Sequence, residues 1–303
     1  MTDLFQQRLN LLRSTSIMPQ LTHIRRGIEK EGLRSTQDGK IASTSHPKKL
    51  GSTLTHPSIT IDYLRDIHNY AYSCLGDELI WPASMPCILE GEDSIAIAEY
   101  GSSNIGTLKH VYRIGLAHRY GKTMQAIAGV HYNFSLPLDF WPVFKDAVGE
   151  KVSDQAFQTD QYFALIRNFH RYSWLTLYLF GASPALCASF MASQPAEGQA
   201  HQLDRLDEHT LYSPLATSLR MGDLGYQNDA QQDINVCYNS LERYVEGLGK
   251  AIHSSLPAYE KLGIKVDGQY RQLNTNILQI ENEYYSDIRP KRVTPSGQKP
   301  LHV

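Results

Sequence analysis

The sequence lacks the features that identify a membrane protein or a protein built on cysteine chemistry. No apolar run approaches the roughly 20 residues that a membrane helix needs, and MTDLFQQRLNLL has acidic and amide residues where a signal peptide is basic. The four cysteines, Cys74, Cys87, Cys187 and Cys237, are too far apart to form a zinc or redox Cys-x-x-Cys pair. We therefore predict a cytoplasmic protein with reduced, buried thiols.

The sequence also lacks an excess of positive charge. It has 29 Lys and Arg residues against 31 Asp and Glu residues, for a net charge of −2. Proteins that bind nucleic acids generally carry a basic surface. We therefore predict no nucleic acid partner, and the missing apolar run predicts no membrane partner. Carboxylates on strand faces and Arg and Lys in loops instead suit Mg²⁺ and a small anionic substrate. The chain of 303 residues is long enough to bury a large core, so an enzyme is compatible with these limits.

Two common glycine motifs of enzymes are missing as well. The Gly-Lys pairs that end at Lys40, Lys122 and Lys250 lack the upstream glycine of a phosphate-binding loop. No G-x-S-x-G nucleophile elbow occurs either. The first absence excludes a P-loop NTPase, and the second leaves a hydrolase without support.

The sequence does contain two closely spaced glutamates, Glu29 and Glu31, in RRGIEKEGLR. On a strand they would project from one face, about 6 to 7 Å apart. A divalent cation such as Mg²⁺ between them would remove their repulsion, whereas a solvated strand face is the alternative. The dipeptide Asp38-Gly39 predicts a hairpin in which residues 40–42 return as the partner strand.

Hydrophobic periodicity predicts a mixture of helices and strands. Helices are expected at residues 4–12, 107–120, 122–128 and 160–180, and from a cap at Asn239; the fourth is apolar nearly all round and stops at Gly181. In GVHYNFSLP, His131 shares a polar strand face with Asn133 and Ser135. A second strand is expected in RQLNTNILQIENEYY, with Glu281 and Glu283 on one face, and an exposed loop at residues 191–207.

Several segments together resemble one family. These are RGIEKEGLR, HPKKLGSTLTHPSITIDY, WPASMPC, YGSSNIGTLKHVYRIGLAHRYG, GVHYNFSLP, YLFGASPA, ATSLRMGDLGY and LQIENEYYSDIRPKRVTPSG. In this order they are similar to bacterial glutamate-cysteine ligase, which joins the γ-carboxyl of glutamate to the amine of cysteine with ATP and Mg²⁺. The resemblance implies an α+β, glutamine-synthetase-like catalytic domain over residues 1–303, with a mainly antiparallel sheet and flanking helices.

The resemblance also implies roles for individual residues. Glu29 and Glu31, with Asp62 and His131, would hold Mg²⁺, or Mn²⁺ in its place, under the ATP phosphates. The amino-acid pocket would be lined by Tyr112, Leu116, Gln125, Arg220, Tyr226 and Tyr285, with Arg220 as the catalytic carboxylate clamp. Lys291 and Arg292 would be phosphate neighbours, and Glu281 and Glu283 metal-side acids. The ordinary alternatives are a core stripe for Tyr112 and Leu116 and a surface ion pair for Arg220.

This sequence departs from the family pattern at two places. After Tyr63 the family has about twenty further residues with a metal-binding glutamate, and it continues beyond the IRPKRVTPSG segment into a further metal-binding strand. The expectation from the resemblance is therefore a ligase that lacks an internal segment and is incomplete at its C-terminus. The alternatives are a ligase that uses another amine, and a catalytically silent relative that binds an amino acid or a partner.

Overall fold

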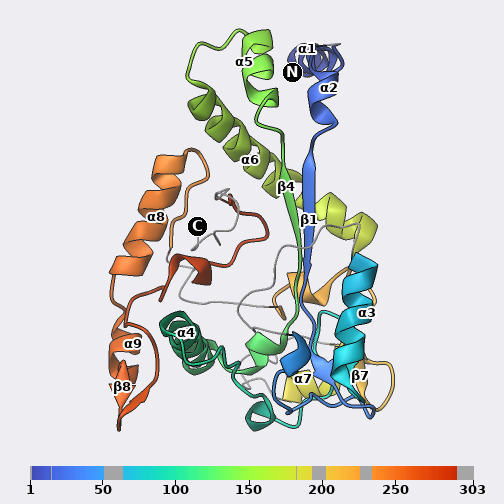
Figure 1. Ribbon diagram of the computed structural model, residues 1–303, viewed down its shortest axis with the longest axis vertical. Coiled ribbons are helices and arrows are strands. Elements are labelled where there is room, and N and C mark those ends of the chain that lie inside the picture. Colours follow the sequence, from blue (N-terminus) through green and yellow to red (C-terminus); the bar gives the residue numbers. More distant parts are fainter. Residues whose placement is uncertain are drawn as a thin grey trace.

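The computed structural model describes residues 2–14, 16–50, 64–181, 183–192, 203–225 and 234–291. A long antiparallel ribbon of strands β1 (Arg25–Lys30) and β4 (Val130–Ser135) runs along the long axis, between a helical end and an end with short strands (Figure 1). Within the described part of the chain, these two strands pair only with each other.

The helical end contains α1 (Thr2–Leu12), α2 (Met18–Leu21), α5 (Phe140–Val148) and the start of α6 (Asp154–Phe180). Gly149 ends α5 in the left-handed conformation, and Ser153 then caps α6 by accepting a hydrogen bond from the amide of Ala156. The buried side chains here are Ile17, Phe140, Trp141, Phe144 and Phe157. This apolar cluster fixes the turn between β4 and α6.

The opposite end contains helices, small sheets and several 3-10 turns. The helices are α3 (Leu64–Leu75), α4 (Asn104–Tyr120) and α7 (Ala188–Ala192). The sheets pair β2 (Arg34–Ser35) with β3 (Leu79–Ile80), and β5 (Ala185–Cys187) with β7 (Thr210–Tyr212), which also pairs with β6 (Asp204–Arg205). The 3-10 turns are η1 (Lys48–Leu50), η3 (Glu92–Ser94), η4 (Thr123–Ala126) and η6 (Leu219–Met221).

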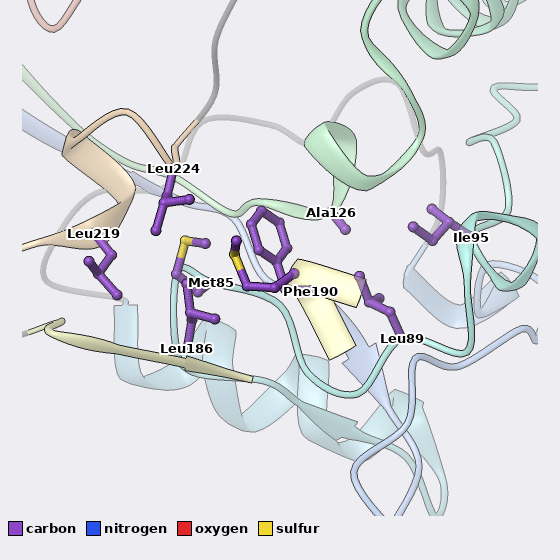
Figure 2. Packing of buried hydrophobic residues seen from close by; sticks show 9 residues of the cluster. Met85, Leu89, Ile95, Ala126, Leu186, Phe190, Leu219 and Leu224 are labelled. Atoms are coloured by element: carbon purple, nitrogen blue, oxygen red, sulfur yellow. The ribbon is translucent and has the colours of Figure 1, made fainter. Parts of the chain in front are cut away.

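A hydrophobic core at this end holds η4 and η6 in place. Phe190 lies fully buried at its centre, with Ala126 of η4 and Leu219 of η6 in the same cluster (Figure 2). Packing of Ala126 and Leu219 in this core therefore positions the residues between Ala126 and β4, and the residues of η6.

The C-terminal part of the described chain forms a layer beside α4 (Figure 1). It comprises α8 (Leu241–His253), α9 (Pro257–Leu262), the pair β8 (Lys265–Val266) and β9 (Gln269–Tyr270), and η8 (Glu281–Glu283). Phe163 of α6, Tyr244 and Leu248 of α8 and Leu278 form its core.

The expected hairpin forms at its turn, with Ile41 and Ala42 returning antiparallel to Ser35 and Arg34, but the strand that carries Glu29 is not part of it. The Asp38-Gly39 turn forms, because the amide of Thr36 donates to the carbonyl of Lys40 and Gly39 has a φ of +81°. This turn, however, brings Ile41 back to Ser35, and β1 pairs with β4 instead. The Asp38-Gly39 signal thus predicts the local bend, whereas β1 takes its partner from a segment about one hundred residues away.

Three other sequence expectations also needed correction. The run before Tyr285 is irregular chain ending in η8 rather than a strand, because side-chain bonds such as Asn274 Nδ2 to the Gln279 carbonyl (2.9 Å) replace a ladder. Met191, expected in a loop, is buried in α7, and residues 193–202 of that loop lie outside the described chain. The cap of α8 is Ser240, one residue after Asn239.

Three other helix predictions were confirmed, and a fourth was wrong in its length and helix type. The predicted helices at residues 4–12, 107–120 and 160–180 appear as α1, α4 and α6, and residues 122–128 give only the short η4. The four cysteines are free, with Cys87 buried and the other three half-buried. Among the described helices, none has the length and apolar character needed to cross a bilayer.

Candidate functional site

Polar side chains gather on one face of the β1–β4 ribbon. Glu29 lies directly opposite His131, and Gly27 lies opposite Asn133. The carboxylate of Glu29 accepts hydrogen bonds from Asn133 Nδ2 (3.0 Å) and lies 3.2 Å from His131 Nδ1. Because Gly27 has no side chain, Asn133 can reach across the ribbon to Glu29. The predicted polar face of β4 is therefore confirmed for His131 and Asn133, which both contact Glu29.

Glu31 lies just beyond the end of β1 and continues its pairing. Its amide donates to the carbonyl of Gly129 (2.9 Å), and its carboxylate Oε2 accepts from the amide of Gly129 (2.7 Å). A Cβ added at Gly129 would lie 3.1 Å from Arg220 Nη2, 3.1 Å from His131 Nε2 and 3.2 Å from Glu31 Oε2. The absence of a side chain at Gly129 thus lets an acid, an imidazole and a guanidinium converge.

The 3-10 turn η6 places the Arg220 side chain next to Gly129. Its neighbour Leu219 is buried in the core, and its own Nε donates to the carbonyl of Ala128 (3.2 Å). Its Nη1 lies 3.5 Å from the hydroxyl of Tyr285. Burial raises the pKa of Tyr285, an effect that the Arg220 charge opposes. Two residues predicted for the amino-acid pocket are thus together.

Lys291 reaches the polar face from the end of the described chain. Its Nζ donates to Asn133 Oδ1 (2.8 Å) and lies 3.3 Å from Glu29 Oε1. Burial on its own would raise the pKa of Glu29. The His131 hydrogen bond, the Lys291 charge and the Asn133 amide outweigh that effect and lower it. Lys291 therefore supplies a cation to the carboxylate that was predicted to hold a metal.

We expect Lys291→Met to raise the pKa of Glu29 back toward the ordinary glutamate range, because it removes that charge and one hydrogen bond. The ionised carboxylate would then contribute less to folding, and its contribution would be lost at a higher pH on acidification. Carboxyl-carbon NMR titration of chelator-treated protein measures this pKa. Lys265→Met, which removes a charge near the Tyr270 ring, is the control. An unchanged Glu29 titration in Lys291→Met would contradict the assignment.

The other predicted pocket residues are placed on or after α4. Leu116 is only 3 % exposed, which agrees with the alternative of a core residue. Gln125 donates from Nε2 to the carbonyl of Arg113 (3.0 Å), and the carbonyl of Tyr112 accepts from Gln279 (3.4 Å). Asp62, Tyr226 and Arg292 lie outside the described residues. The roles of Tyr112, Leu116, Gln125 and Tyr226 in the amino-acid pocket, of Asp62 as a metal ligand and of Arg292 as a phosphate neighbour stay predictions.

Glu283 lies in a buried network away from the ribbon. Its carboxylate accepts from Tyr120 (2.7 Å), from the amide of Gln279 (2.6 Å) and from Arg119 Nη1 (3.3 Å). The side chains of Arg119 and Glu283 are fully buried. Burial raises the pKa of Glu283 although Arg119 and Tyr120 oppose the shift. We therefore assign this acid to holding η8 on α4, and we do not propose it as a metal ligand.

The oxygen-bearing side chains on the ribbon suit a hard cation, but Glu29 already contacts His131, Asn133 and Lys291. Carboxylates and an amide oxygen are the ligands that Mg²⁺ prefers. In residues 2–291 as far as the structure describes them, no three His, Cys, Asp or Glu side chains are grouped as a metal site. His131 lies between Glu29 and Glu31, and Lys291 contacts Glu29. A metal would therefore require Lys291 to move from Glu29.

The sequence reasoning missed some groups. Asn133 was placed on the polar face but was not given a role, although it binds both Glu29 and Lys291. Its position two residues after His131 was a usable signal. The carbonyl of Ala128 and the amide of Gly129, which hold Arg220 and Glu31, are backbone groups and leave no pattern in a sequence.

Comparison with known proteins gives a consistent set of relatives. The sequence model of the family described as Glutamate-cysteine ligase matches residues 9–303. The Glutamate--cysteine ligase of Pseudomonas aeruginosa PAO1 is 55% identical over 324 positions, which cover 100% of this chain and 60% of the relative. That of Pseudomonas putida KT2440 is 52% identical with the same coverage. The chain thus spans 60% of the length of the curated relatives it matches.

Two solved structures resemble the fold. A Glutamate--Cysteine Ligase from Francisella tularensis in complex with AMP has a TM-score of 0.77 and 37% identity, over 91% of this chain and 57% of that chain. A bifunctional glutathione synthetase from Pasteurella multocida has a TM-score of 0.65 and 26% identity, over 94% of this chain and 34% of that chain. With the helices and antiparallel strands described above, these neighbours confirm the predicted α+β class.

Proposed function

Because the chain belongs to the glutamate-cysteine ligase family, we propose that it catalyses the ATP-dependent joining of the glutamate γ-carboxyl to the amine of cysteine. The product would be γ-glutamylcysteine, in the first step of glutathione synthesis. The observation that carries the proposal is the convergence of Glu31, His131 and Arg220 around Gly129, on residues of the segments that resemble the family. The AMP bound to the Francisella relative supports a nucleotide substrate.

The residues at this convergence have distinct tasks in the proposal. Arg220 would bind the carboxylate of an amino-acid substrate through its planar guanidinium, which the Ala128 carbonyl holds in a fixed direction. The hydroxyl of Tyr285 lies beside the same guanidinium and would give the pocket a second polar wall. Lys291 would move from Glu29 to an ATP phosphate, with Arg292 as its neighbour in sequence. These cations would offset negative charge that gathers during phosphoryl transfer.

The carboxylates of the ribbon would hold the divalent ion. We assign Glu29, Glu31 and His131 to this task, together with Asp62, which lies outside the described residues. Bound Mg²⁺, or Mn²⁺ in its place, would neutralise charge on the transferred phosphate. Until an ion binds, the His131, Asn133 and Lys291 contacts keep the Glu29 carboxylate ionised and oriented.

We expect Glu29→Gln to weaken Mg²⁺ or Mn²⁺ binding by about tenfold or more, since even the outer partners of a metal ligand are worth that much. The fold should stay intact, because the side chain of Glu29 is 55% exposed. Titration calorimetry with MnCl₂ measures the affinity. Glu90→Gln, which removes an exposed acid paired with Lys40, is the control and should bind as the wild type does. Equal affinity in Glu29→Gln would remove Glu29 from the proposed ligands.

The activity itself is tested by ADP release from purified protein with ATP, Mg²⁺ and amino acids, and by mass spectrometry of the product. The proposal predicts ADP release that requires glutamate and cysteine together. Release driven better by another amine would instead identify a related carboxylate-amine ligase. Glutamate binding without any ADP release would identify a silent relative, and would overturn the proposed activity.

The organisation of the whole chain also belongs to the proposal. We assign residues 1–303 to a single ligase-like catalytic domain that lacks an internal segment after Tyr63. The alignment with the Pseudomonas relative is 324 positions long against 303 residues here, which supports a missing internal segment. The expected cytoplasmic location and the expected absence of a nucleic acid partner stay predictions.

A further inference from the structure

Gln279 is a buried residue that joins the C-terminal layer to α4. It is only 4% exposed. Its Oε1 accepts a hydrogen bond from the amide of Leu273 (3.0 Å), and its Nε2 donates to the carbonyl of Tyr112 in α4 (3.4 Å). Leaving a buried polar group unpaired costs free energy, so a side-chain amide that is bonded at both ends is fixed in direction. Gln279 is therefore a fixed link between its own layer and one turn of α4.

Gly115 is the residue of α4 against which this side-chain amide lies. A Cβ added at Gly115 would lie 2.1 Å from Gln279 Oε1 and 2.7 Å from Gln279 Nε2, which is too close for any real side chain. Glycine inside a helix costs about 1 kcal/mol relative to alanine, and here it leaves the space that the amide fills. The turn of α4 that Gln279 contacts therefore carries Tyr112 and Leu116, two residues of the predicted amino-acid pocket.

The backbone of Gln279 also fixes η8. Its amide donates to Glu283 Oε2 (2.6 Å), and Glu283 in turn accepts hydrogen bonds from Arg119 and Tyr120 of α4. The segment from Gln279 to Glu283 is therefore attached to α4 at two points, one near Tyr112 and one near Arg119. We call it the attached segment.

Tyr285 comes two residues after the attached segment. Its hydroxyl lies 3.5 Å from Arg220 Nη1. Arg220 is positioned by a different core, because its neighbour Leu219 is buried with Phe190. Leu278, which precedes the attached segment, is buried against α6 and α8 instead. The contact between Tyr285 and Arg220 thus joins two separately packed parts of the chain, and its geometry depends on what holds the attached segment in place.

We propose that Gln279 is a positioning residue of the amino-acid pocket, which holds Tyr285 where its hydroxyl meets Arg220. It does so by fixing the attached segment on the turn of α4 that carries Tyr112 and Leu116. Gln279 acts through Tyr285 and makes no substrate contact of its own. The consequence for amino-acid binding rests on the proposed function, whereas the placement of Tyr285 is a property of the chain without ligand. A purely structural role of Gln279 would lower stability without moving Tyr285 relative to Arg220.

The first measurement is fluorine NMR of the ligand-free chain with a fluorinated tyrosine at position 285. Arg220→Met shows in which direction the resonance moves when the guanidinium is lost. Gln279→Met keeps the length of the side chain but removes both of its hydrogen bonds, and it should move the resonance in that direction. Asn276→Leu is the matched control, because it removes a bond of the same layer to the Ile252 carbonyl of α8 (2.6 Å). The resonance should stay in place in this control.

Gly115→Ala is a second variant, and it keeps every hydrogen-bonding group of the network. Its methyl group has to displace the Gln279 side-chain amide. Alanine also favours the helix by about 1 kcal/mol relative to glycine, which offsets part of the cost of that displacement. Gly115→Ala should therefore move the Tyr285 resonance as Gln279→Met does, and it decides the question if Gln279→Met does not fold. Circular dichroism and urea denaturation record the folding and stability of each variant.

The second measurement is the affinity for glutamate by titration calorimetry. Gln279→Met and Gly115→Ala should raise the Kd about 3- to 10-fold, the effect of losing one ordinary hydrogen bond. Asn276→Leu should bind glutamate as the wild type does. If the wild-type chain binds glutamate and both variants bind it equally well, Gln279 has no role in the pocket and the proposal is overturned.

Two results of the fluorine measurement would also overturn the proposal. One is a Tyr285 resonance that stays at its wild-type position in folded Gln279→Met and Gly115→Ala. The other is an equal movement in Asn276→Leu, which would make Gln279 one of many packing contacts. Neither measurement requires catalysis. If the wild-type chain binds no glutamate, the proposed function fails, and the fluorine measurement still decides whether Gln279 positions Tyr285.

Discussion

Arg119→Met is expected to lower the free energy of unfolding by about 3 to 5 kcal/mol, the usual cost of removing one partner of a buried ion pair. Arg119 and Glu283 have fully buried side chains, so Glu283 would remain as an uncompensated charge. Arg119 also donates to Gln272 Oε1 (2.8 Å) and to the carbonyl of Asn274 (2.8 Å), and its guanidinium lies 3.9 Å from the centre of the Tyr259 ring. Urea denaturation followed by circular dichroism measures the loss.

The pH dependence of this variant provides a second readout. Burial raises the pKa of Glu283 above its value in the unfolded chain. The stability that comes from a neutral Glu283 carboxyl is therefore present at acidic pH and is lost as pH rises through the raised pKa. Without the Arg119 charge the pKa should rise further, so Arg119→Met should lose least stability in acid. Lys250→Met breaks an exposed pair with Glu246 and should leave stability unchanged. A similar small effect of Arg119→Met would contradict the importance of the buried pair.

Arg220→Lys is expected to weaken amino-acid binding by about 1 to 3 kcal/mol, the range of a hydrogen bond to a charged group. Lysine keeps the positive charge but loses the planar fork that can bind a carboxylate with two hydrogen bonds. It also loses the Nε bond to the Ala128 carbonyl that orients the side chain at Gly129. Glutamate binding to the chain, measured by calorimetry, gives the change in affinity directly.

The control for this substitution is Arg205→Lys. Arg205 is exposed on β6 and donates to the carbonyl of Glu208 (2.7 Å), away from the ribbon. It should bind glutamate as the wild type does. If Arg220→Lys also binds with unchanged affinity, Arg220 does not contact the substrate, and the surface role considered in the sequence analysis becomes the better interpretation.

The parts of the fold that were predictable are those specified by neighbouring residues. The alternation of His131 and Asn133 with Tyr132 and Phe134 identified β4 and its polar face, because strand geometry fixes which side chains share a side. The partner of β1 was not predictable by the same means. Strand pairing depends on segments about one hundred residues apart, whereas the Asp38-Gly39 signal reports only a local turn.

The candidate site shows the same division. Glu29 and Glu31 were recognisable by their spacing and by resemblance. The buried environment of Glu283 was not recognisable, since its i, i+2 spacing from Glu281 is the same as theirs. What separates the two pairs is their surroundings, with Arg119 and Tyr120 enclosing Glu283 and solvent reaching Glu29.

Gly129 has a consequence for how this sequence can change over generations. Its backbone does not require glycine, because its φ lies outside the left-handed range. Alanine would therefore be acceptable to the main chain, yet its methyl group would occupy the space between Glu31, His131 and Arg220. Selection at this position therefore acts on the empty volume that the three side chains share. Even substitution by alanine would alter the environments of all three side chains at once.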